Sequence, residues 1–283
     1  MRELSIFIDE SGDVGRVSDF YLVALVFHEQ QHGIEENVLL YERALATKRL
    51  DIMPFHFNPL INGNDEYRWK SIQMRKEHLH VFRTFVEHLP VAQAVFIYDK
   101  KKAGGHEGLA SAIEKDLKVF LFDHLSYLQQ FDVVIIYYDG GQSVVTEAVH
   151  QAIASCISRE AIVYKDAIAG RYRLSQVADY VCGIELTRLK FERHMETKTD
   201  VTFFGAYGNF KKNFLRKLRK KRMRIVDSDP AFHGKIQAVT SKEGASKCRG
   251  RFPRLFCYSA FQVMSTRTGV SCSGVGVAGS LGN

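Results

Sequence analysis

The chain has 283 residues, with 39 Lys and Arg against 32 Asp and Glu and a formal net charge of +7. A hydrophobic share of 46% with 25% charged residues is ordinary for a globular chain, and the basic excess favours anionic partners such as nucleic acid. No apolar stretch approaches the roughly 20 residues of a membrane-spanning helix, and the chain starts with a strand pattern instead of a signal peptide. We therefore expect a soluble, cytoplasmic protein with no membrane partner. The five cysteines form no CxxC pair, so neither a disulfide framework nor a zinc ribbon is indicated.

Apolar runs of strand length alternate with longer stretches of helical spacing through the first 192 residues. The short runs predict five strands, at residues 4–8, 20–27, 91–98, 132–138 and 161–164. The longer stretches predict five helices, at residues 34–50, 67–88, 107–130, 143–158 and 175–192. This alternation predicts an α/β fold, with a mixed sheet and flanking helices. Ligand sites in such folds lie at the carboxyl ends of strands.

The chain changes character after residue 208. Residues 209–224 (NFKKNFLRKLRKKRMR) form a basic run in which Phe210, Phe214 and Leu218 recur at the spacing of one helix face. Residues 241–283 lose periodicity and end in a Ser/Gly-rich segment; a shifted reading frame would also explain them, and sequencing the gene across codon 240 would test it. We expect three parts: an α/β domain over 1–208, a basic helical extension over 209–240, and a low-complexity, disordered tail over 241–283.

Acidic residues follow two of the predicted strands. Asp9 and Glu10 come after the first strand in IDESGD, and Asp139 comes after the fourth in YYDGG. Tight turns alone would account for the Asp, Ser and Gly residues at either place. Because both places lie where an open sheet presents side chains to a ligand, a shared site is the alternative. Asp13, beyond Ser11-Gly12, is interpreted as turn chemistry.

A third acid lies in the predicted helix LSQVADYVCGIELTRL. Gln176, Asp179 and Gly183 are spaced to share one face of this helix. An aspartate on a helix is most often solvated, but the small Ala178 and the apolar Cys182 beside it favour a partly buried position. Gly183 would let another element approach closely.

These motifs, in this order, resemble the domain-of-unknown-function 3800 family, whose fold is similar to ribonuclease H. The resemblance covers about residues 3–210 and rests on IDESGD, the apolar second strand, YYDGG and SQVADYVCG. It implies a ribonuclease-H-like sheet and a cluster of carboxylates that holds Mg²⁺ or Mn²⁺, with Asp9, Asp139 and Asp179 as metal ligands and Glu10 as a supporting catalytic acid.

The resemblance also leaves one position open. Ribonuclease H takes a further glutamate from a helix, and no motif places that residue here; the candidates are Glu66, Glu77 and Glu10. The chemistry of clustered carboxylates is consistent with a metal site. Hard divalent ions prefer oxygen ligands, and neighbouring carboxylates repel each other unless a cation neutralises part of their negative charge. Two such ions could activate a water molecule and stabilise the leaving oxygen of a phosphodiester.

Two further features bear on function. His56, in MPFHFNP, could approach a phosphate, but a histidine between two phenylalanines is more often a packed residue. The basic run is the best candidate for contact with the phosphates of RNA or DNA, and its alternative is a solvated helix face. Its candidate nucleic-acid-binding residues are Lys211, Lys212, Arg216, Lys217, Arg219 and Lys220.

Two functions follow from the sequence. The first is a divalent-metal-dependent nuclease or related phosphodiester-processing enzyme that uses the carboxylate cluster. The second is a non-catalytic module that binds nucleic acid or protein and keeps the fold; the unplaced fourth acid favours it.

Overall fold

A computed structural model describes residues 1–12, 18–138, 141, 143–157, 162–165 and 172–223. Five strands form one sheet: β1 (Glu3–Ser11), β2 (Phe20–Glu29), β3 (Ala92–Asp99), β4 (Val133–Tyr137) and β5 (Ile162–Lys165). The longer helices are α1 (Glu35–Thr47), α3 (Ile72–His88), α4 (His106–Asp123), α6 (Ser143–Cys156) and α7 (Arg173–Glu192). The shorter ones are α2 (Phe57–Asn62), the 3₁₀ turn η1 (Asp65–Tyr67), α5 (Leu125–Leu128), α8 (Lys198–Phe204), α9 (Tyr207–Phe210), the π-helical turn η3 (Lys211–Leu215) and α10 (Arg216–Arg219).

The sheet is mixed, with strand order β3-β2-β1-β4-β5. β1 and β2 run antiparallel, as do β2 and β3, whereas β4 lies parallel to both β1 and β5. The sequence-predicted α/β class, with a mixed sheet and flanking helices, is confirmed. Because β1 and β4 are parallel neighbours, their carboxyl ends meet at the same edge of the sheet.

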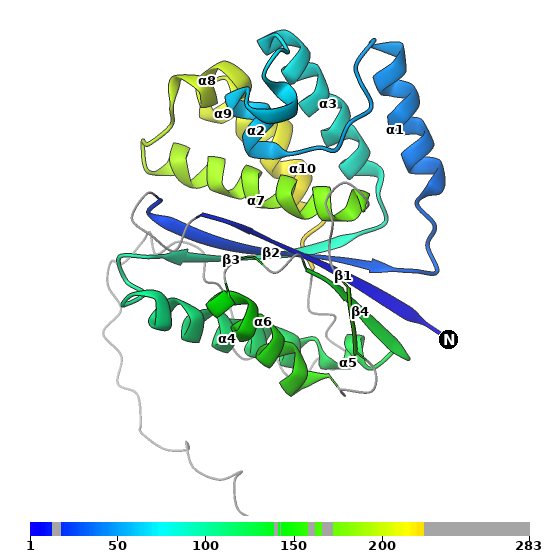
Figure 1. Ribbon diagram of the computed structural model, residues 1–283, viewed down its shortest axis with the longest axis vertical. Coiled ribbons are helices and arrows are strands. Elements are labelled where there is room, and N and C mark those ends of the chain that lie inside the picture. Colours follow the sequence, from blue (N-terminus) through cyan, green and yellow to red (C-terminus); the bar gives the residue numbers. More distant parts are fainter. Residues whose placement is uncertain (13–17, 139–140, 142, 158–161, 166–171, 224–283) are drawn as a thin grey trace, which may run out of the picture. The chain divides into compact units, whose positions relative to one another are not determined.

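Helices cover both faces of the sheet (Figure 1). On one face α7 packs against β1 and β2, with α1, α2, α3 and α8–α10 outside it, and on the other face lie α4, α5 and α6. Each face has its own core: Phe7 of β1 packs on the α7 side, whereas Leu4, Ile6 and Ile8 pack on the α4 and α6 side. β1 includes Asp9 and Glu10, so this alternation also decides to which face each of these two side chains points.

Several element boundaries differ from the predicted ones for local reasons. α3 starts at Ile72 because the Ser71 hydroxyl accepts a hydrogen bond from the Met74 amide and caps the helix there. The predicted helix over 107–130 is divided into α4 and α5 at His124. α2 and α8 were not predicted. No helix in the described ranges is both long and apolar enough to cross a membrane.

The basic run packs on the body of the protein. The described residues belong to one compact unit, and Phe210, Phe214 and Leu218 are buried in the core on the α7 side. The three apolar residues at four-residue spacing therefore lie on the inner side of this segment. The predicted tail over 241–283 lies outside the described residues, as do Asp13, Asp139 and the end of the predicted extension beyond Met223.

Candidate functional site

A cleft of about 210 Å³ opens beside the carboxyl end of β1. The first half of α7 and the segment leading into α2 form its other walls, and both Asp9 and Asp179 line it. The full set of lining residues is Ile8, Asp9, Glu10, Phe55, His56, Asn58, Pro59, Ser175, Gln176 and Asp179. The structure thus brings together two of the three sequence-predicted metal ligands, from segments 170 positions apart in the chain.

One face of α7 holds the opposite wall of the cleft in place. The side-chain oxygen of Gln176 accepts a hydrogen bond from the Phe55 amide at 3.0 Å, and Asp179 accepts one from the Phe57 amide at 2.8 Å. Gly183, one turn further, lies against the Phe57 ring, because a Cβ atom at this position would be 2.2 Å from two ring carbons. The predicted shared face and the close approach at Gly183 are both confirmed.

His56 lies between these two anchored amides and lines the cleft. It is half-buried and precedes the first residue of α2. Ser175 is a cleft residue that the sequence pattern did not single out. It is buried, and its hydroxyl has no hydrogen-bond partner within the described structure.

The negative charges of Asp9 and Asp179 interact with the buried thiol of Cys182. The Cys182 thiol donates a hydrogen bond to the Asp9 carbonyl at 3.5 Å. Burial raises the pKa of this thiol well above its ordinary value, and the negative charges of Asp9 and Asp179 raise it further. Cys182 therefore stays a protonated, weak donor, and the two carboxylates concentrate negative charge on this side of the sheet.

Glu10 is positioned differently from Asp9. β1 continues to Ser11, so consecutive side chains point to opposite faces of the sheet. The Glu10 carboxylate accepts hydrogen bonds from the hydroxyls of Tyr21 and Tyr138, whose rings belong to the core on the α4 and α6 side. It also lies beside Gly141. The structure therefore does not place the Glu10 carboxylate on the Asp9 face.

The remaining acidic candidates lie elsewhere or outside the described residues. Asp139 is among those not described, and the described residues on this side of the gap end at Tyr138, one residue after β4. Glu77 forms an ion pair with Lys48 at 2.6 Å on the surface of α3, and Glu66 is exposed in η1. Among the described residues, no group of three or more His, Cys, Asp and Glu side chains is arranged to hold a metal ion.

The six basic candidate residues lie together on the segment from α9 to α10, on the side away from its buried apolar residues. Five of them are exposed, and Lys217 is half-buried. Comparison with protein-family models, curated proteins and solved structures gives no match to this chain.

Proposed function

We propose that this protein is a divalent-metal-dependent nuclease with a ribonuclease-H-like fold that hydrolyses phosphodiester bonds of RNA or DNA. The observation that carries this proposal is that Asp9 and Asp179 line one cleft at the carboxyl end of the first strand. Asp139 is the third proposed ligand. Phe7 pairs with Tyr137 across the parallel strands β1 and β4, and Asp9 and Asp139 each follow two residues later in the sequence.

The donor atoms in the cleft suit Mg²⁺ or Mn²⁺. Two carboxylates around a small cleft repel each other, and a cation with a preference for oxygen ligands relieves this repulsion. The buried Ser175 hydroxyl adds another oxygen without a partner in the described structure. When bound, such an ion would supply Lewis-acid stabilisation of a phosphoryl oxygen and a more acidic water molecule.

The side chains around the cleft would position the substrate and move protons. Asp179 is held by the Phe57 amide and is therefore oriented before substrate arrives. The half-buried His56 ring can donate a proton to a leaving oxygen or accept one from water. Asn58, exposed at the mouth of the cleft, can donate to a phosphate oxygen.

The alternative is a non-catalytic module that binds nucleic acid or protein on the same fold. Two observations favour it: the described residues contain no group of three acids suited to a metal, and Asp179 already serves as the acceptor for the start of α2. In this case the cleft acids only stabilise the fold.

The deciding experiment compares Asp9→Asn with Asp51→Asn. Asp51 is an exposed acid that pairs with Lys70 and is not among the residues that line the cleft. Cleavage of labelled RNA, DNA and hybrid duplexes is measured with Mg²⁺ and with Mn²⁺, and metal binding is measured by calorimetry. We expect Asp9→Asn to abolish cleavage and weaken metal binding at unchanged melting temperature, and Asp51→Asn to do neither.

Two results would count against the proposal. A wild-type chain that cleaves none of the three substrates and binds neither ion would favour the non-catalytic module. Equal cleavage rates in the two variants would show that Asp9 is not an active-site residue.

A further inference from the structure

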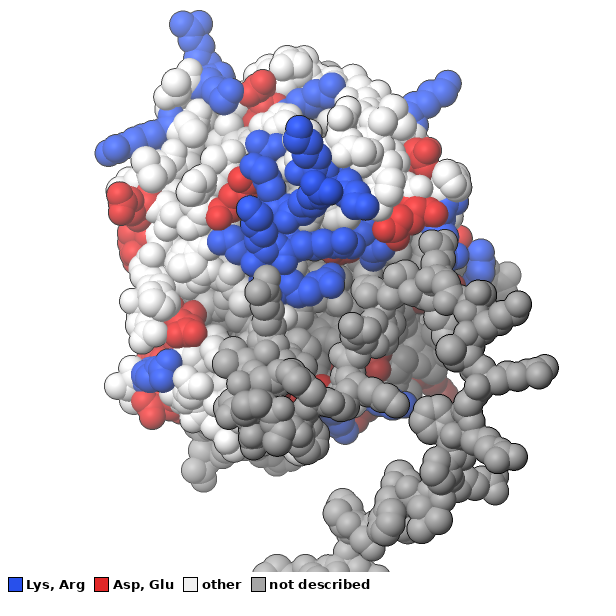
Figure 2. Space-filling view, turned by 180° about the vertical axis from the view of Figure 1, so that it is seen from behind, with Lys and Arg blue, Asp and Glu red and all other residues white. Residues whose placement is uncertain are grey.

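A basic surface covers the outer side of the segment from α9 to α10. Figure 2 shows Lys and Arg side chains gathered into one patch on this side of the molecule. We define the basic surface as Lys211, Lys212, Arg216, Lys217, Arg219 and Lys220. No acidic residue interrupts the sequence between Lys211 and Lys220, so the charge of this stretch has a single sign.

The inner side of the same segment is fixed to the protein body. Phe210, Phe214, Leu215 and Leu218 are each at most 3% exposed. Arg83 of α3 lies over the Phe214 ring and donates a hydrogen bond to the Asn213 carbonyl. The basic surface is therefore presented on a docked helix, which limits the conformational entropy lost on binding.

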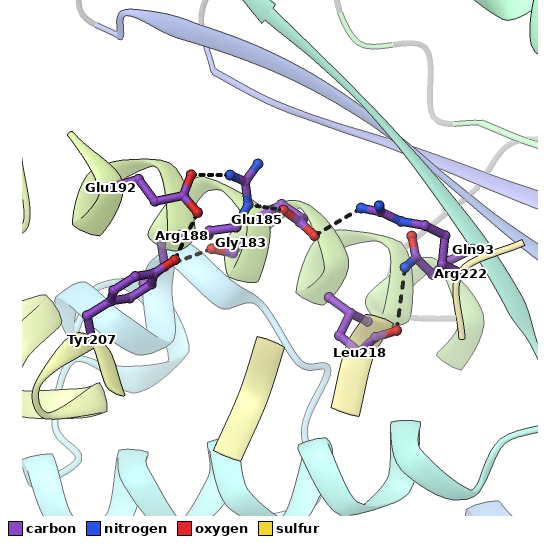
Figure 3. Close-up of polar contacts among 9 residues, drawn as sticks. Gln93, Gly183, Glu185, Arg188, Glu192, Tyr207, Leu218 and Arg222 are labelled. Atoms are coloured by element: carbon purple, nitrogen blue, oxygen red, sulfur yellow. Dashed lines mark hydrogen bonds and ion pairs between the residues drawn. The ribbon is translucent and has the colours of Figure 1, made fainter. Parts of the chain in front are cut away.

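An ion pair between Arg222 and the buried Glu185 fastens the end of this segment to α7 (Figure 3). Glu185 is fully buried and pairs with Arg188 at 2.6 Å and with Arg222 at 3.7 Å. The backbone on either side of Arg222 bonds to Gln93 of β3, through the Lys221 carbonyl at 2.7 Å and the Met223 amide at 2.8 Å. The basic segment is thus held at both α7 and the sheet edge.

The described residues leave most of the charge on the basic surface without an acidic partner. Lys217 pairs with Glu87 at 2.7 Å, and the Lys211 ammonium lies over the Tyr207 ring. The other four members have no ion pair within the described part of the chain. These four are Lys212, Arg216, Arg219 and Lys220. Their positive charge is available to an external anion.

We propose that the basic surface binds the phosphate backbone of double-stranded nucleic acid without reading its sequence. The stretch from Lys212 to Lys220 spans at most about 12 Å, because the rise is roughly 1.5 Å per residue in an α-helix and smaller in the π-helical turn η3. A duplex carries up to about seven phosphates over that length. The four cations without an ion pair in the described structure can each contact one of these phosphates.

The aromatic residues of the segment favour a duplex over unpaired bases. Single-strand binding relies on exposed rings on which bases stack. Phe210 and Phe214 are buried, and the Tyr207 hydroxyl donates to Glu192 while Lys211 covers its ring. The surface offers charge without stacking, which suits the backbone of paired strands.

The test measures binding of the full chain to short DNA and RNA duplexes and to the matching single strands, in EDTA. The variant Lys212→Ala/Arg216→Ala/Arg219→Ala removes three cations from the basic surface. The matched control is Lys101→Ala/Lys102→Ala/Lys115→Ala. It removes two cations from the loop between β3 and α4 and one from α4, which covers the opposite face of the sheet from α7. Both variants have the same net charge, so a general charge effect changes both equally.

We expect the wild type to bind duplexes more tightly than single strands. The slope of log affinity against log salt, taken between about 50 and 200 mM, should be about −4. The basic-surface variant should lower the size of the slope by about 3 and weaken binding roughly tenfold or more. The control should keep the wild-type slope. The DNA and RNA arms show which duplex is preferred.

Three outcomes would overturn the proposal: equal losses in both variants, tighter binding to single strands, or binding of phosphatidylserine vesicles that duplex does not displace. Because EDTA removes divalent ions, this test does not depend on the proposed hydrolysis. A chain that binds duplex through the basic surface but cleaves nothing would keep this inference and count against nuclease activity.

Discussion

Asp179 accepts a hydrogen bond from the backbone amide of Phe57 at 2.8 Å while it also lines the cleft beside Asp9. One carboxylate thus connects α7 to the start of α2 and contributes charge to the candidate site. A structural role needs only an acceptor oxygen, whereas a metal-binding role needs the negative charge. Substitutions that remove these properties separately can therefore distinguish the two roles.

The first prediction compares Asp179→Asn with Asp179→Ala. Asparagine keeps an acceptor for the Phe57 amide, so we expect its free energy of unfolding to stay within about 0.5 kcal/mol of the wild type. Alanine leaves that amide without its partner and should cost about 1–2 kcal/mol. Both should lower Mg²⁺-dependent cleavage by about 100-fold or more. Urea unfolding and a cleavage assay measure the two effects, and full cleavage by Asp179→Asn would restrict Asp179 to a structural role.

The second prediction concerns Gly183→Ala. The added methyl group would lie 2.2 Å from carbons of the Phe57 ring, so Phe57 must shift away from α7. We expect a loss of about 1–3 kcal/mol in the free energy of unfolding, typical of an overpacked core. In the double variant Gly183→Ala/Phe57→Leu the smaller side chain should recover part of this loss. Additive losses in the double-mutant cycle would show that the two positions are not coupled.

The sequence pattern predicted the sheet and the α7 face well, because both depend on local periodicity. The apolar runs that became β1 to β4 are buried by the helices on both sides. Gln176, Asp179 and Gly183 share a face simply because a helix repeats every 3.6 residues. Neither inference needed knowledge of which segment would contact that face.

α2 could not be predicted because tertiary contacts form it. The sequence FNPLIN contains Pro59 and is followed by Gly63, which is the composition of a loop. Pro59 is tolerated because it lies in the first turn, where its missing amide hydrogen would have no helical partner. The anchoring of Phe55 and Phe57 on α7 then brings His56 and Ser175 to one cleft, a relation between segments about 120 residues apart.

The third prediction separates Glu10 from Asp9. The Glu10 carboxylate accepts hydrogen bonds from Tyr21 and Tyr138 on the opposite face of the sheet. We expect Glu10→Gln to lower the free energy of unfolding by about 1–2 kcal/mol, since one amide group cannot accept from both hydroxyls at equal strength. Cleavage, measured at saturating Mg²⁺ well below the melting temperature, should stay within about threefold of the wild type. A loss of cleavage as large as that of Asp9→Asn would show that Glu10 takes part in catalysis.

The fourth prediction is acid destabilisation through His78. Burial lowers the pKa of His78 to about 4, with the nearby Lys70 charge acting in the same direction. Between pH 6.5 and 4 the unfolded chain therefore binds more protons than the folded one, so stability falls as the pH falls through this window and is unaffected by His78 above it. The loss attributable to this residue is on the order of 3 kcal/mol.

His78→Phe keeps a ring beside Tyr67 and removes the titrating group. We expect the stability difference between pH 7.5 and pH 4.5 to shrink in this variant but not to vanish, because burial also lowers the pKa values of His28, His80 and His150. An unchanged difference, measured by urea unfolding at both pH values, would show that His78 does not carry this dependence.

The last prediction concerns the ion pairs that hold the basic segment. Arg222→Met removes the outer cation of Glu185, whose carboxylate still pairs with Arg188. Because Arg222 is 41% exposed, we expect a global loss of only about 1 kcal/mol. The local effect should be larger: the Gln93 and Met223 amides, which bond across this contact, should exchange their hydrogens faster. The Ile6 amide in the central strand β1 should be affected only through global unfolding.

Glu185→Gln should act differently, because it removes the charge from the buried centre of the network. Arg188 keeps Glu192 as an acidic partner among the described residues, so we expect a loss below the roughly 3–5 kcal/mol of a buried ion left without any partner. The loss in the free energy of unfolding should exceed that of Arg222→Met. If the fixed position of the segment matters for binding, Arg222→Met should weaken duplex binding in proportion to the faster local hydrogen exchange. If Arg222→Met speeds exchange at Met223 without weakening duplex binding, the fixed position of this end of the segment is unimportant for the basic surface.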